Sequence, residues 1–396
     1  MRDLGRLALA SSLYLAAQTL YAALPSHPAV HTFEPTAQEI GDDWYVDIRA
    51  GTSVAIRNET AFMGMPGLNK VAIYKRSTSG WSRTGTISAP EAATEFGAVI
   101  AHRDDTTIVA SDSYAYVFKL VNGTWKYTQK LSADIGAASF DSLAYQDNTV
   151  VAGLAQIDAP GAVYAFDLTT AGKLVKRAKL QANDAQPNDL FGVDVSMSSN
   201  LILVGAPGSG DGAAYVFRRS SGRWAQKQRL IGQGSSGEGF GQAVAVNNGV
   251  VAIGAPSEDY EWSEAADGYH VAGGAVFLFA PNSAGLYSQS QRIRPSSADV
   301  TNFQDFGGEI VMSGNRLAVI SVEMIPGPGD YAPGQAFTYT LANNRAAPLG
   351  FISLVPPFRA AGFSNSWLVV GQPYIGGCAA NGCIGQATLF DVSKRQ

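Results

Sequence analysis

The sequence has little of the material from which metal and redox centres are built. Its 396 residues include only two cysteines and four histidines. Both cysteines lie in the stretch "CAANGC" with no histidine nearby, which disfavours a zinc site and leaves metal ligation unexpected. Basic residues are also scarce, since 28 Lys and Arg stand against 33 Asp and Glu. The net charge of −5 gives no reason to expect a nucleic-acid partner.

The signatures of common catalytic sites are missing as well. The sequence contains no H-E-x-x-H, no G-x-S-x-G and no Walker loop. The letters "GQGSSG" at 232–237 match G-x-G-x-x-G, but a strand pattern and not a helix follows them, which argues against a nucleotide site. We therefore expect a protein that is not an enzyme, with no catalytic residues and no cofactor.

Long hydrophobic runs are absent apart from one at the N-terminus. Residues 7–24 are apolar, follow two arginines and end in small residues, as in a secretory signal peptide cut near Ala22 or Ala23. The alternative for residues 1–24 is an N-terminal membrane anchor, and no other segment could insert into a membrane. Either location is extracellular or at the cell surface, where Cys378 and Cys383 are expected to form a disulfide.

What the sequence does have is a repeat. The residues "FGVDVSMSSNLILVGAP" at 191–207 return as "FGQAVAVNNGVVAIGAP" at 240–256. Weaker copies keep the same 12 residues between their FG-like and GAP-like ends, and they begin at Ala50, Phe96, Phe140, Phe306 and Pro357. An apolar–turn–apolar pattern held in register seven times indicates a repeat architecture.

Each repeat predicts four short strands. In the copy at 191–230, an alternating segment, a turn and a continuously apolar segment precede "GAAYVF" (212–217) and the polar "WAQKQRL" (224–230). The polarity of the segments rises toward the fourth, as expected of a strand at the outer edge of a sheet. Because one such sheet cannot bury its own faces, the sequence predicts an all-β fold, a seven-bladed β-propeller of four-stranded antiparallel blades over residues 31–396.

Particular residues of the repeat have predicted packing roles. Phe191 is expected to fill the gap between neighbouring blades, and Gly192 and Gly205 to allow close backbone approach or positive φ. The seventh repeat ends after its third strand, while residues 31–40 precede the first repeat without a blade of their own. We expect 31–40 to be the N-terminal strand that completes the last blade and closes the ring, with Ile40 placed as Leu230 is in its own repeat.

The seven FG and GAP ends resemble FG-GAP repeats. The pattern is similar to the N-terminal β-propeller of integrin α subunits and to the FG-GAP repeats of secreted and surface microbial proteins. The resemblance implies the propeller fold. Proteins with this fold have adhesion, lectin-like and enzyme-linked functions, so the resemblance does not select among them. Integrin-like repeats often carry a calcium loop, D-x-D-x-D-G-x-x-D, but here the interval is a plain hairpin. Calcium binding is thus possible only without a standard loop.

One loop is the candidate binding site. In a propeller the loops between strands 2 and 3 share one face with the loops between blades, and here their lengths vary widely. The longest, "SEDYEWSEAADGYHVAG" at 257–273, has five acids, four aromatic or imidazole rings and no Lys or Arg. Such a surface suits sugar rings, cations or a basic protein patch, although a solvated insertion with Trp262 packed on its blade is the alternative. The candidate ligand-binding residues are Asp259, Tyr260, Glu261, Trp262, Asp267, Tyr269 and His270.

Asn58 and Asn122 match the N-glycosylation sequon and fall in predicted hairpin turns on the opposite face. Asn-Gly is also a favoured tight turn, so turn chemistry alone explains Asn122.

Three functions fit these observations. The first is a secreted or cell-surface, non-enzymatic adhesion or carbohydrate-binding module that recognises a glycan or an extracellular protein through the loops of one face. The second is an extracellular polysaccharide hydrolase or lyase with acidic residues on that face. The third is a structural propeller of the cell envelope.

Overall fold

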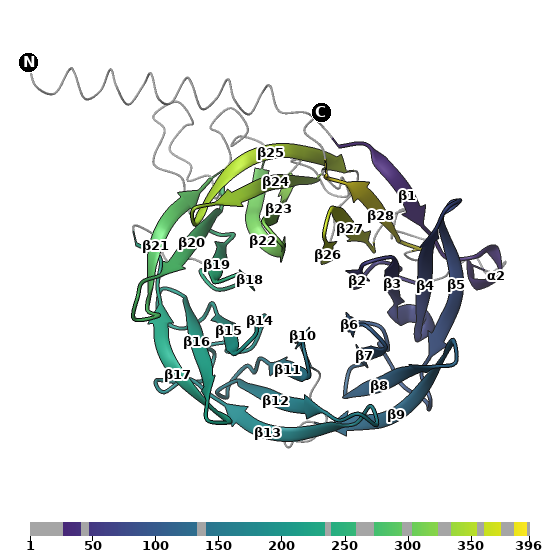
Figure 1. The fold of residues 1–396 in the computed structure, drawn as a ribbon, viewed down its shortest axis with the longest axis horizontal. Coiled ribbons are helices and arrows are strands. Elements are labelled where there is room, and N and C mark those ends of the chain that lie inside the picture. The colour runs from purple at the N-terminus through teal and green to yellow at the C-terminus, as the bar shows by residue number, and fades with distance from the viewer. Residues whose placement is uncertain are drawn as a thin grey trace, which may run out of the picture.

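The protein is a ring of seven four-stranded antiparallel sheets around a central axis (Figure 1). The computed structural model describes residues 27–40, 47–132, 140–233, 239–258, 273–294, 303–323, 334–354, 360–373 and 384–393. The predicted fold class, a seven-bladed β-propeller, is confirmed. Among these residues no helix has the length and apolar character needed to cross a membrane.

The blades follow one another along the chain, with the first strand of each at the axis and the fourth at the rim (Figure 1). Six blades are continuous: β2 (Val54–Arg57), β3 (Thr60–Met65), β4 (Lys70–Ser77) and β5 (Gly80–Ser88); β6 (Val99–Arg103), β7 (Thr106–Ala110), β8 (Tyr114–Val121) and β9 (Thr124–Ser132); β10 (Ser142–Gln146), β11 (Thr149–Leu154), β12 (Ala162–Leu168) and β13 (Leu174–Leu180); β14 (Val195–Ser198), β15 (Leu201–Ala206), β16 (Ala213–Ser220) and β17 (Arg223–Leu230); β18 (Val244–Asn247), β19 (Val250–Ala255), β20 (Ala275–Pro281) and β21 (Tyr287–Ile293); β22 (Phe303–Ser313), β23 (Arg316–Glu323), β24 (Gly334–Ala342) and β25 (Arg345–Leu354). The seventh blade combines β26 (Ala360–Ser364), β27 (Trp367–Gln372) and β28 (Gln386–Asp391) with the N-terminal β1 (Ala29–Phe33).

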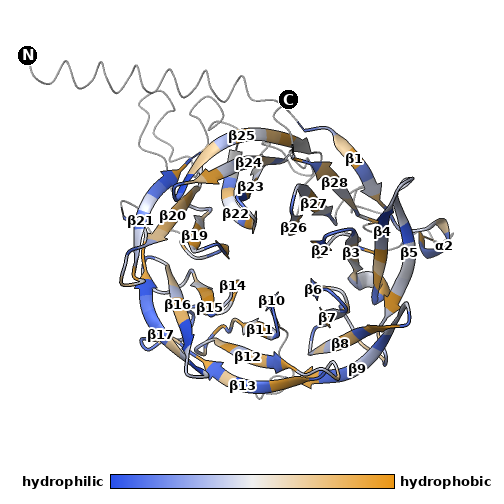
Figure 2. Ribbon diagram, in the orientation of Figure 1, coloured by the Kyte–Doolittle hydropathy of each residue, from blue (hydrophilic) through white to orange (hydrophobic). Residues whose placement is uncertain are grey.

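Hydrophobic residues concentrate on the second and third strands of each blade. Every residue of β15 and β19 is buried, whereas exposed and partly buried residues alternate along β17 up to the buried Leu230. Figure 2 shows the same trend, with hydrophilic stretches along the outer strands β17 and β21. The polar fourth strand predicted from the repeat is therefore the outer edge.

The phenylalanine of the FG motif is the wedge between blades. Phe191 is fully buried in a cluster that contains Val151 and Val163 of the preceding blade. Its ring makes an edge contact with Tyr215 of its own blade, at 5.5 Å between centroids. Phe96, Phe140, Phe240 and Phe306 make equivalent edge contacts with the aromatic residue of their own third strand.

The two motif glycines meet across the interface between blades. Gly192, in the FG position, has a φ of +97°, a left-handed conformation that L side chains rarely adopt. Gly205, in the GAP position, faces the carbonyl oxygen of Gly241 in the next blade, and a Cβ there would collide with it. The same approach recurs in the pairs Gly64–Gly97, Gly153–Gly192, Gly254–Gly307 and Gly371–Gly51. Both predicted glycine roles are confirmed.

Glutamines of the fourth strands connect neighbouring blades at the rim. The Gln228 side chain donates to the carbonyl of Tyr287 and accepts the backbone N–H of Tyr287, each at 2.7 Å. Gln129 forms the same pair of bonds with Leu174, and Gln291 with Ala346. Each glutamine therefore satisfies backbone groups of an outer strand that has no strand beside it.

The N-terminal strand closes the ring, as predicted, but its extent differs. β1 pairs antiparallel with β28, with Phe33 opposite Ala387. In the blade of β14–β17, Leu230 of the outer strand lies opposite Ala214 of the third strand. Phe33 is therefore the residue equivalent to Leu230, and the prediction that Ile40 has this position is wrong. Residues Ala37–Ile40 form a short helix, α2, because Thr36 and Glu39 make a capping box in which each side chain accepts the other's backbone N–H.

An ion pair fixes this closing segment to the first blade. Arg83 on β5 donates to both carboxylate oxygens of Glu39, at 2.6 and 2.7 Å. Burial acts to raise the pKa of Glu39, but hydrogen bonds from Arg83 and Thr36 outweigh it and lower this pKa to about 2. The segment after β1 is thus attached to the blade beside the one that β1 completes.

We predict that Gly205→Ala destabilises the protein strongly. The new methyl group meets a backbone carbonyl that cannot turn aside, so unfolding should require about 2 kcal/mol less, with a clear fall in Tm. Gly85→Ala is the matched control, because Gly85 is also in a strand and a Cβ there meets only the Ile73 side chain at 3.7 Å. Equal melting temperatures for the two variants would contradict the interface described above.

We also predict a pH-dependent effect of Glu39→Gln. Folding lowers the Glu39 pKa from 4.5 to about 2, so its stabilising contribution is complete above pH 4.5 and lost as the pH falls toward 2. The variant should therefore be less stable than the wild type by about 2 kcal/mol at neutral pH, and the difference should vanish in acid. Urea unfolding at several pH values measures this. A difference that does not change with pH would contradict the ion pair.

Candidate functional site

A cavity lies on the axis where the inner strands begin. Its volume is about 860 Å³, and its outer part is lined by residues that directly follow the FG position, such as Thr52, Ala98, Val193 and Gln242. The first strand of each blade starts on the face that carries the loops between blades and those between strands 2 and 3. The cavity therefore opens on the face that the sequence predicted to be functional.

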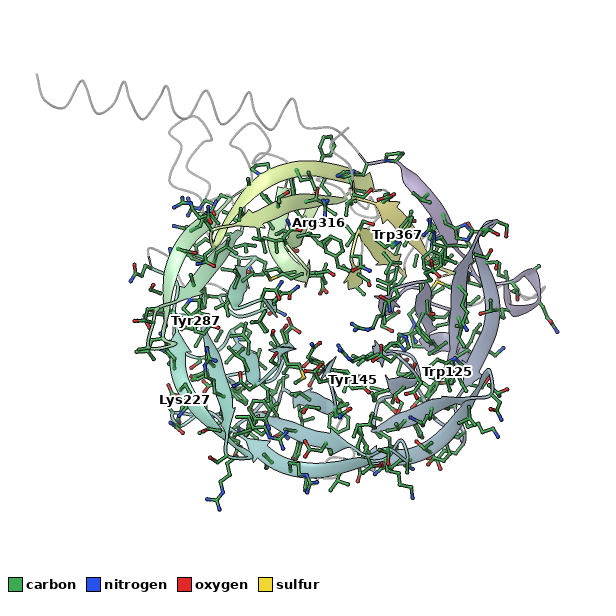
Figure 3. All side chains as sticks on the ribbon, viewed as in Figure 1. Trp125, Tyr145, Lys227, Tyr287, Arg316 and Trp367 are labelled. Atoms are coloured by element: carbon green, nitrogen blue, oxygen red, sulfur yellow. The ribbon has the colours of Figure 1, made fainter. Side chains whose placement is uncertain are left out.

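A second, smaller cavity of about 290 Å³ continues deeper along the axis. Tyr145 of β10 is part of its wall and lies close to the axis in Figure 3, whereas Lys227 lies on the outer rim. Leu143, Asp194, Glu309 and Ala361 line both cavities, so they form a neck between the two. The two cavities therefore adjoin each other at the neck.

Four carboxylates line the outer cavity. Asp141 and Asp305 lie at its mouth and are exposed, while Asp194 and Glu309 lie at the neck and are partly buried. Within the described part of the chain, no Lys, Arg or His is among the residues lining either cavity. The axial cavities are therefore acidic, with their most enclosed charges at the neck.

Each neck carboxylate also bonds to the free edge of a neighbouring blade. The backbone N–H of Val244 on β18 donates to Asp194 Oδ2 at 2.7 Å. Glu309 on β22 accepts the backbone N–H of Ala361 on β26 in the same way. These bonds hold both side chains in place on rigid strands.

Enclosure shifts the titration of both groups toward neutral pH. Burial raises the pKa of Asp194 to about 7, against hydrogen bonds from Val244 and Val195 that lower it. Burial and the charge of Asp194 together raise the pKa of Glu309 to about 8, against the Ala361 hydrogen bond. The charge of Asp194 thus adds to the effect of burial on Glu309.

The long acidic loop begins at the rim of this cavity. Pro256 and Ser257, at the end of β19, line the mouth. The next residue, Glu258, is 1% exposed and pairs with Arg292 and Arg294 at the end of β21. The backbone N–H of Gly274 donates to the Glu258 carbonyl at 3.1 Å, which closes the base of the loop. Glu258, counted among the acids of the loop, is thus its anchor.

The predicted ligand-binding residues lie outside the described residues. This applies to Asp259, Tyr260, Glu261, Trp262, Asp267, Tyr269 and His270, and also to Cys378 and Cys383. Both sequon asparagines are described. Asn58 and Asn122 are exposed turn residues with φ of 52° and 50°, so the turn accounts for both, and glycosylation stays a prediction.

The neck carboxylates were missed in reading the sequence, although a signal was present. Asp194 stands three residues after Phe191, and Glu309 stands three residues after Phe306. The other five repeats have Ser53, Val99, Leu143, Ala243 and Ala360 at that position. An acid at a position that is otherwise small or apolar marks a departure from the packing needs of the repeat.

Comparison with known proteins agrees with this architecture. The family model described as FG-GAP repeat matches residues 174–217, which span β13 to β16. The crystal structure of Saccharomyces cerevisiae Sqt1 superposes with a TM-score of 0.53 at 10% identity, over 93% of this chain and 100% of that one. At this identity the likeness concerns the fold alone. The search of curated proteins finds no significant match.

The ring of seven four-stranded blades makes this chain a β-propeller. Residues 174–217 of this propeller match an FG-GAP repeat, and the FG and GAP glycines meet across its blade interfaces. This fold and repeat indicate a binding or adhesion type of module.

We predict that Glu309→Gln becomes more stable than the wild type as the pH rises. Folding raises the Glu309 pKa from 4.5 to about 8, so its favourable contribution is complete below pH 4.5 and lost as the pH rises through 8. Glutamine carries no charge and can still accept the Ala361 bond. Urea unfolding should show similar stability at acid pH and an advantage of about 1–3 kcal/mol for the variant at about pH 9. Parallel pH profiles would contradict the enclosed charge, and the exposed Glu59→Gln is the control.

Proposed function

We propose that this protein is a secreted or cell-surface binding module, without enzymatic activity, that recognises a glycan or an extracellular protein on the face around the mouth of the axial cavity. One observation carries the proposal: the cavity opens on the face from which the long acidic and aromatic loop departs, and the loop begins at residues of the cavity rim, Pro256 and Ser257.

The construction of the loop base supports a binding role. A buried carboxylate held by two arginines costs desolvation energy, and here it fixes the first end of the insertion, while the bond from the Gly274 N–H to the Glu258 carbonyl holds the second. A fixed base reduces the conformational entropy that the loop loses when it contacts a ligand. Tyr260, Trp262 and Tyr269 in this insertion offer faces for sugar rings or for apolar and cationic groups of a protein.

An extracellular polysaccharide hydrolase or lyase is the second candidate function, because of the neck carboxylates Asp194 and Glu309. Groups with a pKa near 7 or 8 in a cavity are suited to general acid catalysis, as in glycoside hydrolysis. Incubation with polysaccharides, followed by measurement of released reducing ends, tests this alternative. Release that disappears in Glu309→Gln would establish it and overturn the non-enzymatic proposal.

We predict that Trp262→Ala abolishes ligand binding while the fold is retained. A glycan array and a panel of extracellular matrix proteins should be probed with the wild type and the variant. Loss of an aromatic platform should weaken binding at least about tenfold. Tyr127→Ala is the matched control, because Tyr127 is 47% exposed on the outer strand β9, away from the axis.

Two results would contradict the proposal. Binding that is lost in Tyr127→Ala and kept in Trp262→Ala would move the site to the outer rim. A folded protein that binds neither glycans nor proteins would favour the structural role in a cell envelope.

A further inference from the structure

The charged residues of the outer strands all have one sign. None of the seven strands at the rim contains an Asp or a Glu. Three of them, β9, β13 and β17, together have eight Lys and Arg. Because the protein as a whole has a net charge of −5, this part of the rim has a charge opposite to that of the molecule.

The basic residues concentrate in three consecutive blades. The third strand, turn and fourth strand of these blades, residues 114–132, 162–180 and 213–230, have twelve Lys and Arg and one acid. We call these twelve residues the basic arc: Lys119, Lys126, Lys130, Lys173, Lys176, Arg177, Lys179, Arg218, Arg219, Arg223, Lys227 and Arg229. The corresponding parts of the next two blades have one basic residue each, Arg292 and Arg345.

Protection of the sheet edges does not account for this distribution. Charged side chains on an outer strand discourage pairing with strands of other molecules. However, a β-bulge between the third and fourth strands already interrupts the edge in each of the six continuous blades. The outer strand β21 has one basic residue and β1 has no Lys or Arg, although both are edges of the same kind. The basic arc therefore exceeds what the edge requires.

Part of the basic arc is paired within the protein. Five of its members form ion pairs, namely Lys119 with Asp105, Lys130 with Glu91, Arg177 and Arg219 with Asp167, and Arg229 with Asp184. Lys126, Lys173, Arg223 and Lys227 are exposed and form no ion pair within the described part of the chain. Figure 3 shows Lys227 on the outer rim. These four positive charges are available to an anionic ligand.

Hydrogen bonds join the three outer strands into one surface. Gln129 of β9 bonds to the carbonyl and to the N–H of Leu174 on β13, at 3.1 and 2.7 Å. Gln226 of β17 accepts the backbone N–H of Asn183, which follows β13, at 2.9 Å. The basic side chains therefore project from strands that are fixed relative to one another. A surface prepared in this way loses little backbone entropy when a ligand binds.

The shape of the rim selects the kind of anion. Figure 1 shows that β9, β13 and β17 follow the convex outside of the ring. Duplex nucleic acid is stiff over about 50 nm, so it cannot follow this curve. Single-stranded nucleic acid binds by stacking its bases on aromatic side chains, and the exposed residues of β13 and β17 include no aromatic ring. A flexible chain with anionic groups along its length meets both conditions.

We propose that the basic arc binds an acidic polysaccharide, a glycan chain with carboxylate or sulfate groups, laid across β9, β13 and β17. Residues 173–179, "KLVKRAK", have four basic side chains in seven and form the centre of the surface. Lys126 on β9 and Lys227 on β17 contact the chain on either side of this centre. The surface lies on the rim and is independent of the loop site on the axial face.

The test is the binding of fluorescently labelled heparin, a sulfated glycan, and of labelled polygalacturonate, a carboxylated glycan, to the full chain. Fluorescence anisotropy at about 0.05 M and about 0.2 M salt measures the affinity. We expect the affinity to fall at least about tenfold at the higher salt concentration, because each charge contact releases counterions. Binding of both glycans, or of one alone, supports the proposal and identifies the anionic groups that are recognised.

Two double variants locate the surface. Lys126→Gln combined with Lys227→Gln removes two charges from the basic arc and should weaken binding at least about tenfold at low salt. Lys75→Gln combined with Arg345→Gln is the matched control, because it removes two exposed charges from β4 and β25. The control should change the affinity less than about twofold, since its charges act only over a distance that salt screens. All four side chains are exposed, so both variants should keep the wild-type Tm.

Three outcomes overturn the proposal. One is that the folded protein binds neither glycan at the lower salt concentration. Another is that the two double variants weaken binding equally, which would assign the attraction to net charge and not to the basic arc. The third is that duplex DNA of similar charge binds more tightly than both glycans, which would assign the surface to nucleic acid. Trp262→Ala should bind both glycans as the wild type does, so failure of the loop proposal and failure of this one give different results.

Discussion

The contact between two glycines, made across five of the seven blade interfaces, is the constraint on which the structure depends. The FG glycine of one blade turns with positive φ and brings its carbonyl oxygen against the GAP glycine of the preceding blade. At these five interfaces a Cβ on the GAP glycine would collide with that carbonyl oxygen. This approach recurs at Gly51, Gly97, Gly192, Gly241 and Gly307, and four of these glycines follow a fully buried phenylalanine that packs between the blades. The axial cavity lies inside the ring that these contacts join.

The repeat made the fold predictable because each blade has the same packing problem. The strands, their order, the polar rim and the N-terminal closure follow from the pattern around Phe191 and Gly205. The closing strand was misplaced, with Ile40 assigned where Phe33 packs, because the capping box of Thr36 and Glu39 inserts a helix that the repeat does not contain. Spacing alone does not reveal an insertion that departs from the period.

The site was less predictable because it arises from residues that are distant in sequence. The loop at 257–273 could be recognised by composition, and the structure places its first residues at the cavity rim. Asp194 and Glu309 come from blades separated by a third, and the arrangement of the blades around the axis brings them to one neck. A single odd residue in a repeat gives a local signal, but the coupling of two such residues requires the complete ring.

The most direct test of this account is NMR titration of the side-chain carboxyl carbons of Asp194 and Glu309. The account predicts a pKa of about 7 for Asp194 and of about 8 for Glu309. Titration of both groups near pH 4, their ordinary range, would show that the neck is open to water and would contradict an enclosed acidic neck.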